Sequence, residues 1–397
     1  MKIHPAIAKR RHSAFSLIEL MVSVAVLSLM LVIVFQMLEQ MQKTWKRTRQ
    51  NVSEFKDART GFEEMGRRIG QATMNAYYGY QYKEGAPLGG FSTRYGNQIV
   101  RESELHFVCG PNSVLFQGAQ SKGGGGRPGH SIFFQAPFGF CFDQDKETKG
   151  RRQYEQLNGL LNAWGYFVEF NTDELDRPRF LNALRNAPAA RPRYRLMEFR
   201  QPTEYLQVFK LNLRDMPQGS SAKSMYRWFS EGLFSVNSAW NAEKDPPKDD
   251  LFFRTSRPIA ENVVAMIIQP RESTAKNTAR RPEDLAPKYV YDTRLWQQGG
   301  AAAALTGLPA KTRHVLPPIL DISFITVDEG SFSKYALRNA IETTDQDPKF
   351  ISDELFISAD KRTKDFDEAE KKLRSLGLEY RIFNTSIRLR ESKWSDT

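Results

Sequence analysis

A long apolar stretch near the N-terminus constrains this chain more than any other feature. Residues 1–14 are short and basic, and FSLIELMVSVAVLSLMLVIVFQML follows them from Phe15 to Leu38. A helix over these residues is roughly 36 Å long, which exceeds the roughly 30 Å of a bilayer core. No proline occurs between Pro5 and Pro87 to kink or end such a helix. The stretch therefore predicts a membrane-spanning helix at 15–38.

The charged residue inside this stretch is Glu19. An ionised carboxylate within the hydrocarbon costs about 2.5–3.5 kcal/mol, so such a residue usually has a partner or a function. A secretory signal peptide has an apolar region of roughly 7–15 residues and then a small-residue cleavage site. This stretch is longer and continues into a helical pattern. A plain uncleaved anchor fits the length but leaves Glu19 without an explanation.

The residues around Glu19 suggest an explanation. Ser13 to Leu20 read SAFSLIEL, which resembles the type IV prepilin signature. The resemblance implies that a prepilin peptidase cuts between Ala14 and Phe15, that the new Phe15 amine is N-methylated, and that Glu19 pairs with a neighbouring subunit's N-terminal amine. Pairing relieves the desolvation penalty of both charges and so favours one docking register. The family usually has Gly before the cut, so Ala14 predicts retained but slower processing.

The orientation in the membrane does not follow from the flanking charges. Basic residues lie on both sides of the apolar stretch, at Lys2, Lys9, Arg10 and Arg11 before it and at Lys43, Lys46, Arg47 and Arg49 after it. The positive-inside rule therefore does not determine the orientation of the helix. The prepilin resemblance implies a cytoplasmic leader, a single pass through the inner membrane and a periplasmic remainder.

The helical pattern continues over residues 39–75. Apolar residues recur three, four or seven positions apart and share one helical face: Trp45, Val52, Phe55, Ala58, Phe62, Met65, Ile69 and Ala72. Gly61, Gly66 and Gly70 each weaken a helix by about 1 kcal/mol relative to Ala, which predicts fraying or bending there. We expect the apolar face to pack on the globular part of the chain.

Beyond residue 75, short aromatic and β-branched runs alternate with long polar connectors. The runs predict half-buried antiparallel strands at Leu105–Cys109, Ser131–Phe142, Tyr166–Phe170, Tyr194–Phe199, Tyr205–Leu211, Asn262–Gln269, Ile319–Val327 and Tyr380–Leu389. A later helix is expected over Thr363–Leu376, with Asp365 and Glu368 as a capping pair and Gly377 as the C-cap. The predicted class is α+β: one long N-terminal helix packed on an antiparallel β-sheet head, residues 76–397, with long loop insertions.

Several head segments have a recognisable sequence, among them GYFVEF at 165–170, RYRLMEFRQPTE at 193–204 and LPPILDISFITVDE at 316–329. These segments resemble the Verru_Chthon cassette protein C family, a group of pilin-like proteins with a prepilin N-terminus. The later part is also loosely similar to J-type minor pseudopilins of type II secretion and to PilW-like minor pilins. The resemblance implies a pilin-like fold, with a prepilin peptidase, other pilins or pseudopilins and the inner membrane as partners.

No residue pattern in the sequence indicates an enzyme, a metal site or a cofactor. The histidines form no ligand spacing, at His4, His12, His106, His130 and His314. His106 lies in an apolar run, which favours a structural role. The acidic residues Asp245, Asp249 and Asp250 have no defined calcium-ligand spacing.

The cysteines Cys109 and Cys141 leave two alternatives open. A disulfide between them is chemically permitted outside the cytoplasm, and two separate buried thiols fit equally well. The net charge of +11 comes from scattered basic residues, which favours a solvated mixed-charge surface over a nucleic-acid site. The run YRWF at 226–229 interleaves aromatic and basic groups as a DNA-binding surface does, but a buried strand with one exposed Arg also fits.

The main hypothesis is a non-enzymatic minor pilin or pseudopilin of a type IV pilus-like or type II secretion-like filament, assembled through its N-terminal helix. The alternative is an uncleaved, membrane-anchored module whose head binds a polysaccharide, a protein or DNA. Glu19 distinguishes the two, because only assembly between subunits requires its carboxylate.

Overall fold

The computed structural model describes residues 16–81, 98–116, 126–141, 147–148, 151–152, 157, 159–173, 177, 180, 189–203, 206–210, 228–229, 255–273, 282–294 and 312–392. The chain divides into two compact units, Met1–Lys56 and Asp57–Thr397, and the second unit is called the head below. The helix α1, Leu17–Ile69, contributes residues to both units. The division falls inside the predicted amphipathic segment 39–75.

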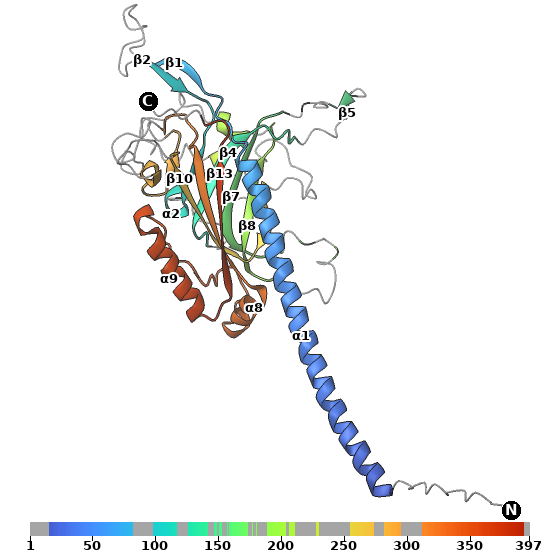
Figure 1. Cartoon of the computed structure of the whole chain (residues 1–397). Helices are drawn as coiled ribbons and strands as arrows, with labels where there is room; N and C mark the ends of the chain where they lie inside the picture. The colour runs from blue at the N-terminus through green and yellow to red at the C-terminus, as the bar shows by residue number, and fades with distance from the viewer. Residues whose placement is uncertain are drawn as a thin grey trace, which may run out of the picture. The chain divides into compact units, whose positions relative to one another are not determined.

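Two antiparallel sheets form the frame of the head (Figure 1). The larger sheet has the order β11-β3-β4-β7-β8-β9, with β3 Val108–Pro111, β4 His130–Ala136, β7 Asn162–Asn171, β8 Arg193–Gln201, β9 Ser256–Glu261 and β11 Tyr291–Asp292. The smaller sheet has the order β10-β12-β13, with β10 Val263–Arg271, β12 Ile319–Val327 and β13 Tyr380–Arg388. The chain passes from one sheet to the other at Asn262, whose φ of 59° permits the sharp turn.

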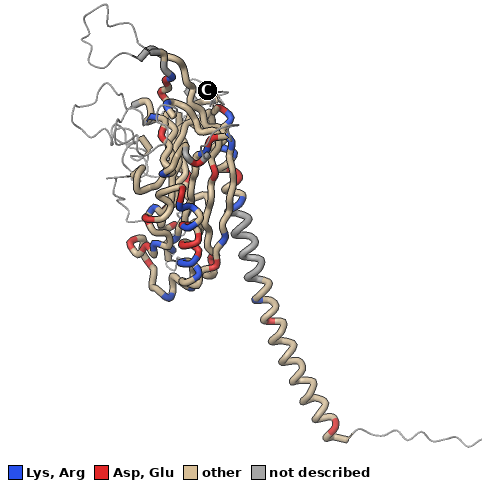
Figure 2. Tube along the Cα trace, turned by 60° about the vertical axis from the view of Figure 1, so that its left-hand side comes forward, with Lys and Arg blue, Asp and Glu red and all other residues tan. Residues whose placement is uncertain are grey.

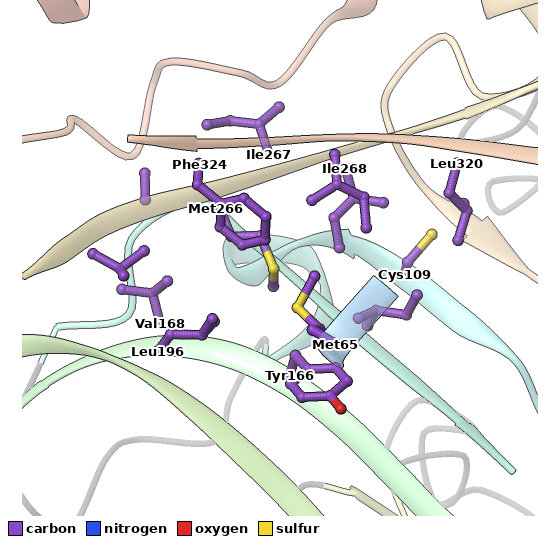
Figure 3. Packing of buried hydrophobic residues seen from close by; sticks show 14 of the residues in the cluster. Met65, Cys109, Tyr166, Val168, Leu196, Met266, Ile267, Ile268, Leu320 and Phe324 are labelled. Atoms are coloured by element: carbon purple, nitrogen blue, oxygen red, sulfur yellow. The ribbon is translucent and has the colours of Figure 1, made fainter. Parts of the chain in front are cut away.

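Side-chain alternation along the strands builds a core between the sheets and a second cluster on the far side of the larger one. In β7, Tyr166 and Val168 enter the core with Met266 of the smaller sheet, as Figure 3 shows. Phe167, between them, joins the second cluster instead. Because successive strand residues point to opposite faces, both faces of the larger sheet are buried here.

Gly165 occupies a position in β7 where a larger side chain does not fit. An added Cβ would lie 2.2 Å from a ring carbon of Phe133. Phe133 and Phe199 are the cross-strand neighbours of Gly165, and their rings meet edge to face with centroids 5.7 Å apart. The missing side chain lets two aromatic rings from neighbouring strands pack over the glycine.

The last turns of α1 enter the core of the head. Phe62, Met65 and Ile69 are buried there, and the ring of Phe62 stacks on Phe324 of β12 with centroids 3.8 Å apart. The apolar face predicted for residues 39–75 therefore packs on the sheet in its last part. A long apolar N-terminal helix followed by antiparallel sheets confirms the predicted α+β, pilin-like class.

Two helices cover the other face of the smaller sheet, α8 (Glu329–Arg338) and α9 (Arg362–Ser375). The side chain of Arg362 donates to Ser323 Oγ at 2.8 Å, and Ser323 points away from the face that carries Phe324. Figure 1 shows α8 and α9 beside the strands of this sheet. The sequence analysis predicted α9 and missed α8, whose first turn is capped by Asp328 accepting from the Ser331 N–H.

The predicted C-cap of α9 is confirmed, and the predicted capping pair near its start is wrong. Gly377 has a φ of 73°, and the N–H groups of Gly377 and Leu378 donate to the carbonyls of Arg374 and Leu373, which is a Schellman cap. Asp365 is not a cap with Glu368. Its carboxylate accepts from the Phe356 N–H at 2.9 Å, because the preceding loop folds back onto the helix.

Strand predictions differ in accuracy along the head. The run Ile319–Val327 coincides with β12. The run Ser131–Phe142 ends as a strand at Ala136, because Pro137 has no N–H to donate. The run Tyr205–Leu211 is wrong as a strand, since its described part forms the short helix α4 (Gln207–Lys210). Short apolar runs of this kind do not distinguish helix from strand.

The remaining elements are short. A separate two-stranded ribbon pairs β1 (Tyr77–Gln81) with β2 (Gln98–Glu102), which the sequence analysis did not predict. The others are α2 (Asn112–Leu115), β5 (Glu147–Thr148), β6 (Arg151–Arg152) and the 3-10 turns η6 (Pro282–Leu285) and η8 (Ala359–Lys361).

Candidate assembly and processing site

The first unit presents an apolar helical surface. Every side chain from Ser16 to Trp45 is exposed, and the exposed fractions of Leu17 and Phe35 are 79% and 67%. Figure 2 shows how sparse charged residues are along this part of α1. By length and composition, Leu17–Trp45 is long and apolar enough to cross a membrane. A continuous apolar surface of this kind requires lipid or other helices to cover it.

Glu19 lies near the start of α1 with its carboxylate exposed. Its backbone N–H donates to Ser16 Oγ at 3.3 Å, and its carbonyl accepts from the Ser23 hydroxyl at 2.7 Å. Both contacts use the backbone. Within the described residues the Glu19 carboxylate makes no hydrogen bond or ion pair, whereas Glu39 on the same helix pairs with Lys43 at 2.6 Å. Glu19 is therefore an available acceptor on an apolar surface.

The other two predicted site residues, Ala14 and Phe15, lie outside the described residues. Processing between them therefore stays a prediction. Ser16 is described, and its hydroxyl accepts from the Glu19 N–H, as a residue at a helix N-terminus does. The helix α1 itself begins at Leu17.

The last turns of α1 are tied to the head by one buried carboxylate, Glu198 of β8, which is 2% exposed. It accepts hydrogen bonds from Arg68 Nη1 at 2.7 Å, from Arg257 Nε at 2.7 Å and from the Trp164 indole at 2.9 Å. The Arg68 guanidinium also lies 4.8 Å from the centre of the Trp164 ring. These four residues are called the Glu198 cluster. Sequence analysis missed it, because its members are scattered along the chain.

The charge balance of the Glu198 cluster favours the ionised arginine. Burial by itself lowers the pKa of Arg68, but the carboxylates of Glu198 and Glu64 outweigh burial and hold that pKa above its ordinary value. The cluster therefore pairs the positive Arg68 of α1 with the negative, buried Glu198 of β8. Such a pair is selective for one rotation of the helix on the sheet.

The structure does not bring Cys109 and Cys141 together in a disulfide; both are buried thiols. Cys109 lies opposite Ile132 of β4, and Cys141 follows well beyond the end of that strand at Ala136. Of the two alternatives left open, the structure has two separate thiols. Burial raises the pKa of the Cys109 thiol far above its ordinary value, which makes it a poor nucleophile.

His106 has two side-chain partners that its sequence position did not indicate. Its Nδ1 accepts from the Trp228 indole at 3.1 Å, and its Nε2 lies 2.7 Å from Asp292 Oδ1. Since the indole can only donate, Nε2 carries the ring proton and the imidazole is neutral. Burial lowers the pKa of His106 in agreement with this assignment. Both ring nitrogens are engaged, which indicates a structural role.

Two further points from the sequence concern metal ligands and the aromatic and basic run 226–229. No group of three or more His, Cys, Asp or Glu in the described part of the chain is arranged to hold a metal ion, and Asp245, Asp249 and Asp250 lie outside that part. At the run 226–229, Trp228 and Phe229 are buried and helical. They line the second cluster instead of forming the strand considered from sequence.

Comparison with known families gives one match. The prokaryotic N-terminal methylation motif matches residues 9–35, which include Ala14, Phe15 and Glu19. Comparisons with curated proteins and with solved structures give no significant match. The motif implies processing by a prepilin peptidase, and together with the apolar helix it suggests a membrane-anchored chain with an extracytoplasmic head. The chain thus joins a prepilin-type N-terminal segment to an α+β, pilin-like arrangement, which indicates a type IV pilin-like or pseudopilin-like protein.

Proposed function

We propose that this protein is a minor pilin or pseudopilin, a non-enzymatic subunit of a type IV pilus-like or type II secretion-like filament. A prepilin peptidase removes residues 1–14, Phe15 becomes the N-methylated terminus, and α1 then leaves the bilayer to join the helices of other pilins. The observation that carries the proposal is Glu19, an unpartnered carboxylate of the described chain on an exposed apolar helix, within the matched motif.

The physical basis is charge pairing inside a bundle of apolar helices. In lipid or among apolar side chains, an ionised carboxylate and an ammonium are each poorly solvated. Pairing Glu19 with the Phe15 amine of another subunit satisfies both groups in one relative position of the two helices. Every other axial shift leaves two unpaired charges, so the pair selects the register of assembly.

The head supports a place at the tip or at sparse positions of the filament. The Glu198 cluster and the stacking of Phe62 on Phe324 attach the last turns of α1 firmly to the head. A helix is only about 10–12 Å across, and the head unit Asp57–Thr397 is far larger. Heads of this size would crowd a shaft built from closely packed helices.

The N-terminal mass of the membrane-extracted protein tests the proposal. Expressed with its native prepilin peptidase, the protein should begin at N-methylated Phe15. An Ala14→Gly variant should be processed faster, since the family usually has Gly before the cut. An intact Met1 terminus, or a cut elsewhere, would contradict the filament proposal.

A second candidate is an uncleaved membrane-anchored binding module. A polar cavity in the head, whose lining includes Arg101, favours it. In that case the terminus would remain Met1, and substitution of Glu19 would leave the protein's function unchanged.

A further inference from the structure

The head contains a cavity of about 450 Å³ that the assembly function does not use. Three segments line it: residues 73–76, which lead from α1 into β1, residues 314–316, which lead into β12, and residues 390–392, which follow β13. Arg101 of β2 completes the lining. The volume falls within the roughly 300–1,000 Å³ of small-molecule sites.

Two guanidinium groups make this cavity suited to an anion. Arg101 and Arg390 both line it, and neither side chain pairs with a carboxylate in the part of the chain that the structure describes. The acidic residue of the lining is Glu391, whose carboxylate already accepts a hydrogen bond from the Thr73 hydroxyl. Two positive groups therefore line the cavity together with a single negative one.

The surroundings of the cavity are also positive. His314 lines it and is uncharged, since burial, together with the nearby Arg294 and Arg313, lowers its pKa to about 3. Arg313 donates from Nε to the carbonyl of Arg101 at 3.1 Å, and its Nη2 lies 3.8 Å from Glu102 Oε1. A carboxylate ligand would enter a region where arginines already outnumber acids.

The remaining lining groups favour a sugar acid over a phosphate. Thr73, Glu391 and Ser392 offer hydroxyl and carboxylate oxygens, which accept hydrogen bonds from sugar hydroxyls. A phosphate dianion has no hydroxyl to donate to the Glu391 carboxylate, and its second negative charge makes repulsion by Glu391 stronger than for a single carboxylate. Beside Arg101 lies the ring of Tyr78, 70% exposed, with its centre 5.9 Å from the guanidinium carbon. An exposed aromatic face of this kind can pack against a ligand ring.

We propose that this cavity binds a carboxylate-bearing saccharide, such as a uronic acid unit of an acidic polysaccharide. Arg101 and Arg390 hold the carboxylate, Thr73 and Glu391 bind hydroxyls, and the ring of Tyr78 packs against the adjoining sugar. The site lies wholly within the head, so its occupancy does not depend on cleavage or assembly. It would allow a filament subunit to attach to an acidic glycan.

Calorimetric titration of the full-length protein in detergent micelles tests the proposal. The probes are trigalacturonic acid, the uncharged galactose trisaccharide and inorganic phosphate. Trigalacturonate should bind saturably, and the uncharged trisaccharide at least about tenfold more weakly. Arg101→Gln and Arg390→Gln should each weaken trigalacturonate binding about tenfold, as expected for a lost charge-assisted hydrogen bond. Arg388→Gln is the matched control, because Arg388 is exposed on β13 outside the cavity lining.

Three outcomes would overturn the proposal: no binding of trigalacturonate, equal binding of the uncharged trisaccharide, or unchanged binding by both arginine variants. If phosphate competes with trigalacturonate and binds with similar affinity, the cavity is a general anion site and the saccharide proposal is wrong. Should a glutamine variant fail to fold, Arg390→Lys keeps the charge and loses the forked geometry, and a several-fold weakening is expected. Because the measurement needs no filament, its failure is distinct from failure of the assembly proposal.

Discussion

At the residue scale, some charged and polar groups in the core of the head are each held by several partners. Glu198 is the clearest case, with two arginines and an indole as donors. His130 is another: its Nδ1 accepts from the Ile268 N–H at 2.9 Å, and its Nε2 lies 2.9 Å from the Phe356 carbonyl. Removing one partner leaves the others desolvated and unpaired, so single substitutions have large effects.

Glu198→Gln should lower the free energy of unfolding of the head by about 3 kcal/mol, because Arg68 and Arg257 lose their shared buried counterion and Arg68 keeps only the more exposed Glu64. Urea denaturation of the full-length protein in detergent measures this change. Glu63→Gln on the same helix is the control: its pair with Arg59 is 2.9 Å long but both side chains are about two-thirds exposed, so a change below about 0.5 kcal/mol is expected. Equal effects of the two variants would refute the role of the Glu198 cluster.

The head should lose stability between pH 6.5 and pH 4 through His130. Burial lowers the pKa of His130 to about 4 in the folded protein, while an unfolded histidine has a pKa of about 6.5. The unfolded state therefore binds more protons in this range. The stabilisation from neutral His130 is complete above pH 6.5 and falls by about 3 kcal/mol as the pH drops to 4.

His130→Gln provides the comparison for this pH dependence, since glutamine does not titrate. Urea denaturation at several pH values measures the free energy of unfolding. As the pH falls, this free energy should decrease more steeply for the original protein than for the variant, and the difference in slope should correspond to about one bound proton. Arg362, the charged group that acts on the ring, stays protonated throughout. Parallel declines in both proteins would mean that another group titrates.

At the element scale, α1 continues through Gly61 and Gly66 and ends at Ile69, directly before Gly70. The two internal glycines face strands of the head. A Cβ on Gly61 would lie 3.5 Å from the Ile259 carbonyl oxygen, and one on Gly66 would lie 3.5 Å from Ile387 Cδ1. Both are ordinary van der Waals distances, so the fraying or bending expected there is opposed by packing.

Gly66→Ala should therefore stabilise the head by up to about 1 kcal/mol, because alanine restricts the unfolded chain and favours the helix. Gly165→Ala is the matched contrast, since its Cβ would overlap the Phe133 ring, and strong destabilisation is expected. Urea denaturation measures the free energy of unfolding of both variants, which is compared with that of the original protein. Destabilisation by Gly66→Ala would show that β13 cannot adjust around the added methyl group.

At the scale of the whole molecule, assembly and ligand binding are assigned to different units. The exposed apolar helix with Glu19 belongs to the first unit, and the Glu198 cluster and the cavity belong to the head. Contacts within the head hold the last turns of α1, so the assembly surface and the binding surface can be altered separately. This separation makes the two proposals independently testable.

Glu19→Gln should abolish incorporation into filaments while membrane insertion and cleavage persist. The amide cannot form the ion pair, and a loss of at least about tenfold in incorporation corresponds to roughly 1.4 kcal/mol. Cross-linking to co-expressed pilins measures incorporation, and the N-terminal mass reports cleavage. Glu39→Gln is the control, since Glu39 already pairs with Lys43 within its own helix. Normal incorporation of the Glu19 variant would favour the anchored binding module.

The sequence by itself determined features that depend on neighbouring residues. The apolar composition of residues 15–38 predicted a helix long enough to span a membrane, which agrees with the apolar part of α1 at Leu17–Trp45, and the run Ile319–Val327 predicted β12. Gly377 predicted the end of α9, because the left-handed conformation suits glycine. In each case a few adjacent side chains and the backbone set the outcome, so no distant partner had to be known.

Only the tertiary structure decided which distant residues meet. Arg68 and Glu198 are 130 residues apart in the chain, and His106 and Asp292 are 186 apart. Asp365 was expected to cap a helix, but the folded loop brings it the Phe356 N–H instead. Burial and hydrogen bonding depend on every segment that packs around a group. Periodicity and local propensity carry no information on those segments. The cavity, which is lined by three segments and Arg101, could therefore not be predicted from the sequence.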